Sequence, residues 1–130
     1  MAETPTPDFP ADLLDLQQQL HRARHDFAVL CAGLPWSVEP DPGWPGNEHP
    51  HTGEITGGRL ESPGWTPEQR AEHGQLLALL QELAIRVVDH AFWATLPLDG
   101  SRVTARSQLK SHPDAQPAPQ QASAGASAAA

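Results

Sequence analysis

The sequence predicts a mainly α-helical protein built on an antiparallel helical hairpin. Two segments, 10–33 and 66–95, repeat apolar residues at spacings of three and four, which is the period of an α-helix. The residues between them are rich in proline and glycine and contain three of the four tryptophans. A chain of 130 residues allows one small domain, and we expect it to span residues 10–110.

The first predicted helix, residues 10–33, has a narrow apolar seam. Pro10 suits the first turn of a helix, and Gly33 followed by Pro35 predicts its end. The seam covers only about 100° of the helix surface, which is enough for one contact. Its members are Leu13, Leu16, Leu20, Ala23, Phe27, Leu30 and Leu34.

The second predicted helix, residues 66–95, begins at the clearest local signal in the chain. The sequence Thr-Pro-Glu-Gln at 66–69 is a capping box with proline at the first helical position, and Pro97 predicts the end of the helix. Apolar residues over 76–94 cover roughly half of the circumference or more, which exceeds what one narrow seam can cover. We therefore expect the surplus apolar face to form an interface.

We expect the connector, residues 35–65, to be ordered but irregular. Disordered segments are poor in aromatic residues, whereas this one is rich in tryptophan. The tripeptide Pro-Gly-Trp occurs in it twice, at 42–44 and 63–65. A small hairpin over 52–61, turning at Gly57-Gly58, is compatible with the pattern.

The ends of the chain are predicted to lie outside the packed domain. Residues 1–9 are polar and interrupted by proline, which predicts a flexible N-terminus. Residues 111–130 consist mostly of Ser, Pro, Gln and Ala, which predicts a disordered low-complexity tail. Before this tail, residues 99–110 are a candidate third helix with Asp99 as its cap, although its amphipathic pattern is weak.

Composition disfavours several functional classes. The chain has no run of about 18 apolar residues, so it contains no predicted membrane span. Its N-terminus lacks the pattern of a signal peptide. Cys31 is the single cysteine, and we expect it to be buried and inert in a protein of the reducing cytoplasm. A formal net charge of −8 disfavours a general nucleic-acid binder. No cofactor-binding or catalytic motif occurs, so we predict no cofactor and no enzymatic activity.

Three stretches carry a resemblance to a known group of proteins. The sequences LPWSVEP at 34–40, EHPHTGE at 48–54 and SPGWT at 62–66 resemble small uncharacterised actinomycete proteins, often encoded on plasmids or integrated mobile elements. The resemblance spans roughly residues 10–110. It implies a bacterial accessory protein, and it implies no activity and no catalytic residues.

The first functional hypothesis is a non-catalytic protein-interaction or accessory module. Trp44 lies among prolines and glycines and is expected to be an exposed anchor, whereas Trp65 and Trp93 are expected in the core. The partner is an unknown protein or a second copy of the chain, which would form a homodimer. The surplus face of the second helix would contribute Leu79, Ile85 and Phe92.

The alternative hypothesis is a nucleic-acid-associated protein of a mobile element. Arg102, Arg106 and Lys110 recur four residues apart and would form a basic row on a helix. A solvated helix face, or pairing with the acidic connector, is the simpler interpretation of this row. We therefore expect nucleic-acid binding to be weak.

A third hypothesis is a metal site at His49 and His51, with Glu54 beside them. Alternate residues of an extended segment share a face, and two imidazoles with a carboxylate suit zinc or iron. A polar turn is the simpler interpretation. His21 and His25 have a spacing that can chelate a metal on a helix, and they are expected to be solvated instead.

Overall fold

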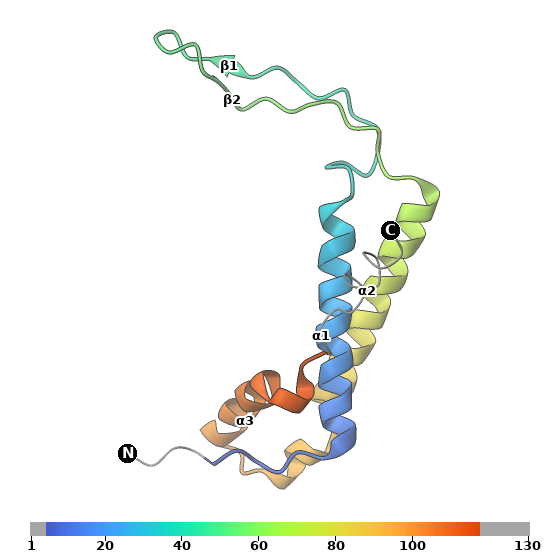
Figure 1. Cartoon of the computed structure of the whole chain (residues 1–130), viewed down its shortest axis with the longest axis vertical. Helices are drawn as coiled ribbons and strands as arrows, with labels where there is room; N and C mark the ends of the chain where they lie inside the picture. Colours follow the sequence, from blue (N-terminus) through green and yellow to red (C-terminus); the bar gives the residue numbers. More distant parts are fainter. Residues whose placement is uncertain (1–4, 118–130) are drawn as a thin grey trace, which may run out of the picture. The chain divides into compact units, whose positions relative to one another are not determined.

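The computed structural model describes residues 5–117, and these form two compact units. Unit 1 comprises the described residues up to Phe27 and from Leu76 onward, and unit 2 comprises Ala28–Gln75. The prediction of a mainly α-helical protein is confirmed (Figure 1). None of the helices in the described part of the chain is long and apolar enough to cross a lipid bilayer.

Helix α1 (Ala11–Ala32) follows Pro10, whose carbonyl oxygen accepts the backbone N–H groups of Leu13 and Leu14. The predicted seam is buried in part. The buried residues are Leu13, Gln17, Leu20 and Ala23, so a glutamine takes a core position beside the apolar members.

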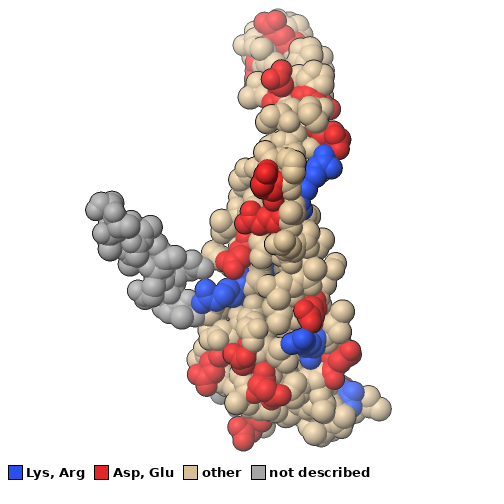
Figure 2. Space-filling model, turned by 90° about the vertical axis from the view of Figure 1, so that its right-hand side faces the viewer, with Lys and Arg blue, Asp and Glu red and all other residues tan. Residues whose placement is uncertain are grey.

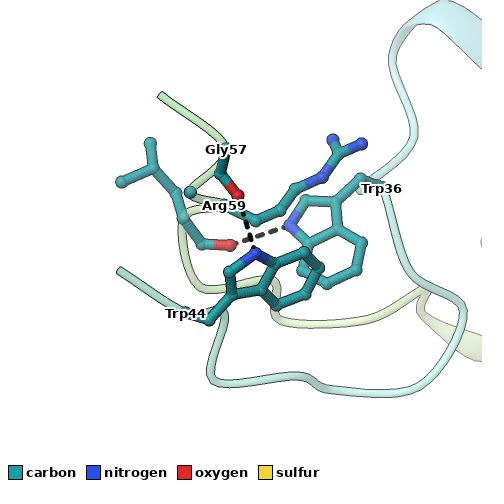
Figure 3. A pocket seen from close by; sticks show the side chains of 6 residues that line it. Trp36, Trp44, Gly57 and Arg59 are labelled. Carbon is teal, nitrogen blue, oxygen red and sulfur yellow. Dashed lines mark hydrogen bonds between the residues drawn. The ribbon is translucent and has the colours of Figure 1, made fainter. Parts of the chain in front are cut away.

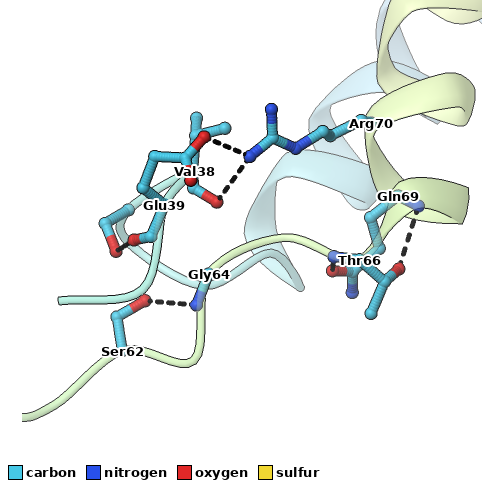
Figure 4. A network of polar contacts seen from close by, with 8 residues as sticks. Val38, Glu39, Ser62, Gly64, Thr66, Gln69 and Arg70 are labelled. Atoms are coloured by element: carbon cyan, nitrogen blue, oxygen red, sulfur yellow. Dashed lines mark hydrogen bonds and ion pairs between the residues drawn. The ribbon is translucent and has the colours of Figure 1, made fainter.

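Helix α2 (Pro67–Val88) begins as the capping box predicts. The Gln69 side chain accepts the N–H of Thr66 at 2.8 Å, and the Thr66 hydroxyl accepts the N–H of Gln69 at 3.1 Å (Figure 4). The predicted end at residue 95 is wrong, because α2 stops at Val88 and a 3-10 helix, η1 (Ala91–Thr95), follows. The indole N–H of Trp93 turns back to the carbonyl of Val87 at 2.7 Å and satisfies one of the last acceptors of α2.

Helix α3 (Gly100–Ser111) confirms the candidate third helix. The Asp99 carboxylate accepts the N–H of Ser101 at 2.8 Å, and the hydrogen bonds from Ser101 lower the pKa of Asp99. Ala105 and Leu109 are buried while Val103 is exposed, so the buried face is narrower than the apolar residues of this helix suggest.

Both predicted ends of the domain need correction. Phe9 lies in the core of unit 1, so the N-terminal segment is packed at least there. A second 3-10 helix, η2 (Pro113–Ala115), follows α3 and buries Ala115 completely, so the predicted tail cannot begin at residue 111. Residues 1–4 and 118–130, where the rest of these two predictions falls, lie outside the described part.

The hydrophobic core of unit 1 joins all three helices. Within this unit α1 and α2 run antiparallel (Figure 1), and the ring of His90 just after α2 bonds to Asp12 in the first turn of α1 at 2.8 Å. The predicted helical hairpin is therefore present, and α3 packs on it. The core residues are Phe9, Leu13, Leu20, Ala23, Leu83, Val87, Trp93, Ala105 and Leu109.

Unit 2 contains a two-armed antiparallel ribbon, residues 38–65, which confirms that the connector is ordered. Strands β1 (Asn47–Glu48) and β2 (Ile55–Thr56) pair near its end, and the arms also pair at Asp41–Ser62 and Trp44–Arg59. The predicted turn at Gly57-Gly58 is wrong. The chain turns between His49 and Glu54, where the His49 N–H donates to the Glu54 carbonyl at 2.7 Å.

Candidate interaction surface

The repeated Pro-Gly-Trp tripeptides lie opposite each other in the ribbon. The residues before them, Asp41 and Ser62, exchange both backbone hydrogen bonds, at 2.9 and 2.8 Å. Each tryptophan also bonds to the opposite arm, at the residue three positions before Asp41 or Ser62. The Trp44 N–H donates to Arg59 at 3.0 Å, and the Trp65 N–H donates to Val38 at 2.8 Å. The hydrogen-bond pattern is therefore approximately twofold symmetric about the Asp41–Ser62 pair.

The two turns are closed by the same type of hydrogen bond, from a glycine N–H to a side-chain oxygen two residues earlier. The Asp41 carboxylate accepts the N–H of Gly43 at 2.8 Å. The Ser62 hydroxyl accepts the N–H of Gly64 at 3.2 Å (Figure 4). Both glycines have a positive φ, 73° and 79° respectively, in the region that other residues rarely adopt. A Cβ atom on Gly43 would also lie 2.3 Å from the Arg59 carbonyl oxygen, so the arms touch there.

The two tryptophans of the repeat have the same hydrogen bond but different surroundings. The indole N–H of Trp44 donates to the Gly57 carbonyl and that of Trp65 to the Pro35 carbonyl, both at 2.9 Å. The Trp65 ring is half-buried and lies 4.9 Å from the His73 ring, whereas Trp44 is 51% exposed. The hydrogen bond of Trp44 links the two arms and so has a structural role. That role does not explain why the Trp44 ring is exposed.

An open cavity of about 540 Å³ lies beside Trp44 (Figure 3). The rings of Trp36 and Trp44 meet edge to face with centroids 5.6 Å apart, and the Trp36 indole donates to the Leu60 carbonyl at 2.8 Å. The Arg59 guanidinium lies over the Trp36 ring, 5.0 Å from its centroid. Gly57, Gly58 and Leu60 complete the lining.

The unit that contains this cavity is acidic. Unit 2 has seven acidic and two basic side chains, a net charge of −5. Of the two bases, Arg59 lies on Trp36, and Arg70 pairs with Glu39 (Figure 4). Acidic atoms recur over the ribbon on the face in Figure 2. A second cavity of about 330 Å³ includes Asp41 and Glu61 in its lining.

The predicted partner-binding residues have different environments. Trp44 is exposed, as expected, and lines the cavity. Leu79 and Ile85 are 43% and 59% exposed on α2. Phe92 is not a free anchor, because its ring packs edge to face on Phe9 and on Trp93, both at 5.5 Å.

The predicted basic row is largely engaged within unit 1. The Arg102 guanidinium donates to the carbonyls of Leu96 and Pro97 and closes the loop before α3. The Arg106 guanidinium lies 5.5 Å from the centroid of the Trp93 ring, and burial lowers the pKa of Arg106. Of the three residues, Arg102 and Arg106 are half-buried and only Lys110 is exposed. The row is therefore not the solvated helix face that the spacing suggests.

The predicted metal ligands do not form a site. The Nδ1 atom of His49 accepts the N–H groups of His51 and Thr52, both at 3.2 Å, and so closes the turn. The rings of His49 and His51 lie 5.8 Å apart, and within residues 5–117 no three His, Cys, Asp or Glu side chains, Glu54 included, could hold a metal ion together.

Two further expectations need correction. His21 is not simply solvated, because its Nε2 atom lies 3.0 Å from the Lys110 carbonyl at the end of α3. Cys31 is exposed rather than buried. His25 is exposed, as expected.

The spacing of the tripeptides did not predict the symmetric turns, although a local signal for them is present in the sequence. A residue with a short polar side chain, Asp41 or Ser62, precedes each Pro-Gly-Trp copy, and such residues favour turns. The Arg59–Trp36 stack had no comparable signal, because it joins residues far apart in the chain.

The structure thus defines a small helical protein with an acidic, tryptophan-bearing ribbon. Residues 12–112 match the family described as a domain of unknown function, DUF8825. The match covers more than three quarters of the chain, which therefore belongs to the DUF8825 family. Neither the curated proteins nor the solved structures include a significant match.

Proposed function

We propose that the protein is a non-catalytic binding module and that the ribbon of unit 2 is its protein-binding surface. The observation that carries the proposal is the difference between the two equivalent tryptophans. Trp65 is half-buried and its ring contacts the His73 ring, whereas Trp44 leaves half of its surface to solvent. Exposed tryptophans in a rigid cavity are the usual anchors of protein interfaces.

The rigidity of the cavity supports binding. Both indoles are held by hydrogen bonds to the second arm, at the carbonyls of Gly57 and Leu60. A partner therefore does not have to order these side chains, which removes part of the entropic cost of association. The lining offers ring faces, backbone and one arginine, and it contains no carboxylate, histidine or cysteine for acid–base or nucleophilic chemistry.

Selection of random peptides on the purified protein tests this function. We expect peptides that bind the wild type and lose affinity with Trp44→Ala, by about 30-fold if Trp44 is a dominant anchor. Because Trp44→Ala also removes a hydrogen bond of the ribbon, Leu60→Ser provides a second test. Leu60 lines the cavity and is 87% exposed, so its replacement preserves the backbone.

The chain offers a matched control for Leu60. Leu98 is also 87% exposed but lies in unit 1, so Leu98→Ser should leave peptide binding unchanged. Equal affinity of wild type, Trp44→Ala and Leu60→Ser for every selected peptide would contradict the proposal, as would a selection that enriches no peptide.

We also propose a cytoplasmic location. The exposed thiol of Cys31 supports it, because reducing compartments keep such thiols free. Mass spectrometry after rapid alkylation of cells would show Cys31 modified by the reagent. Recovery of Cys31 in a mixed disulfide would contradict this location.

A further inference from the structure

We propose that the partner segment is basic and extended, and that one of its Arg or Lys side chains stacks on the Trp44 ring. This inference rests on the proposed function of the ribbon and names the chemistry of its partner. A second basic residue of the same segment would reach the carboxylates of Asp41 and Glu61.

The Arg59–Trp36 contact shows the type of interaction that this surface forms. A guanidinium at 5.0 Å from an indole centroid is within the range of a cation–π interaction, for which tryptophan is the best aromatic residue. The Trp44 ring stands at 84° to that of Trp36, and no described Arg or Lys lies over it. Trp44 therefore offers the same chemistry without an internal cation.

Charge complementarity indicates a cation rather than an anion as the occupant. Six carboxylates of unit 2, all except Glu39, have no ion pair with another described residue, while both bases of the unit are engaged. An acidic peptide or a nucleic acid would meet this negative field, whereas a basic segment would be attracted to it.

The second cavity indicates that the basic segment runs from Trp44 toward Asp41 and Glu61. Its lining comprises Pro40, Asp41, Pro42, Glu61, Ser62 and Pro63. Asp41 lies three residues before Trp44 on one arm, and Glu61 follows Leu60 on the other. An extended peptide advances about 3.3 Å per residue, so one basic residue on Trp44 and another near Asp41 and Glu61 can belong to one short segment.

The test uses the peptides selected on the full chain and synthetic variants of them. We expect enrichment of Arg and Lys, and replacement of the key Arg by citrulline, its neutral isostere, should weaken binding by about two- to thirty-fold, the range of a cation–π contact. Glu61→Gln should also weaken binding, whereas Glu72→Gln, an exposed carboxylate on α2, should not. Affinity should fall as salt rises above about 0.15 M, where the Debye length is about 8 Å.

The outcomes separate this inference from the proposed function. Peptides that need Trp44 and Leu60 but are neutral or acidic, or that bind equally with citrulline, would overturn the basic partner and leave the binding function in place. A selection that enriches nothing on the wild type would overturn both.

Discussion

At the scale of single residues, three histidines close turns with one ring nitrogen. The Nδ1 atom accepts a backbone N–H two residues on in His49, His90 and His112, and the last two cap the helices η1 and η2. An Nδ1 atom that accepts a hydrogen bond is unprotonated, so a neutral ring has its proton on Nε2. In His90 this Nε2–H donates to Asp12 and links the start of α1 to the end of α2.

The His90–Asp12 contact predicts an acid-sensitive part of the folding stability. The hydrogen bond from His90 is the main reason that the pKa of Asp12 lies below its ordinary value of 3.8. Because the folded-state pKa is the lower one, this stabilisation is fully present above pH 3.8 and is lost as the pH falls through the folded-state value. Urea unfolding across this range should therefore show a weaker acid dependence in Asp12→Asn than in the wild type.

Asp26 provides the control for this prediction, since it is an exposed carboxylate further along α1. Asp26→Asn should retain the acid dependence of the wild type. An unchanged acid dependence in Asp12→Asn would show that the contact with His90 does not persist in solution.

Replacement of Phe9, which lies outside every helix, should cause a large loss of folding stability. Its ring is 6% exposed and contacts Phe92, Trp93 and His112 at centroid distances between 5.5 and 6.4 Å. Phe9→Ala should lower the free energy of unfolding by about 3–5 kcal/mol, the usual cost of deleting a buried Phe ring. Val103→Ala, at an exposed position of α3, should change it by less than about 0.5 kcal/mol. Chemical denaturation measures both, and similar small effects would place Phe9 outside the core.

At the scale of elements, the symmetric turns predict how the ribbon responds to added side chains. Gly57 and Gly64 both have a positive φ, so alanine costs about 1–2 kcal/mol of backbone strain at either position. Only at Gly64 would the new Cβ also clash, lying 2.7 Å from the Pro40 nitrogen and 2.8 Å from the Val38 oxygen. Gly64→Ala should therefore open the ribbon, whereas Gly57→Ala should preserve it.

Amide hydrogen exchange at Asp41 and Ser62 measures this difference. Their N–H groups donate across the arms, so exchange should accelerate strongly in Gly64→Ala and only modestly in Gly57→Ala. Equal protection in both variants would mean that the turn at Gly64 does not hold the arms together.

Elements that depend on local signals could be predicted from the sequence. The capping box at Thr66 and the cap at Asp99 involve residues within three positions of each other, and both are present. The end of α2 could not be predicted, because it depends on Trp93 folding back onto Val87. The ribbon turn was misplaced because glycines at Gly57-Gly58 suggest a turn, whereas they allow the arms to approach, with a Cβ on Gly58 lying 2.5 Å from the Gly46 nitrogen.

The candidate site also contains residues whose environment could be predicted from the sequence and residues whose environment could not. Composition and neighbouring prolines identified Trp44 as an exposed residue, and the structure agrees. The fate of Arg102 and Arg106 could not be predicted, because their partners are the Leu96 carbonyl and the Trp93 ring, which α3 meets only after the chain folds. Spacing on a helix shows which residues share a face and not what that face contacts.

Charge is divided unequally between the two units of the protein. Unit 2 has a net charge of −5, whereas the described residues of unit 1 have eight acidic and six basic side chains, a net charge of −2. Unit 1 also contains the buried core, while the ribbon in unit 2 is organised by backbone hydrogen bonds and indoles. The hydrophobic core and the surface that we propose for binding therefore lie in different parts of the chain.

The exposed apolar residues of α2 finally predict the oligomeric state. The surplus face of this helix suggests a homodimer, but Leu83 and Val87 are buried, and Phe92 packs on Phe9 within unit 1. Three large apolar residues of α2 are exposed, namely Leu79, Ile85 and Val88. Around a helix of 3.6 residues per turn Ile85 and Val88 lie about 60° apart and share a face, whereas Leu79 lies about 120° or more from both. Stable interfaces bury about 800 Å² on each partner, which a patch of two side chains and one separate leucine cannot supply. We therefore predict a monomer of 14.0 kDa in light scattering coupled to gel filtration at micromolar concentration. A dimer that dissociates on Ile85→Glu, while Leu98→Glu leaves it intact, would contradict this prediction and place the homodimer interface on α2.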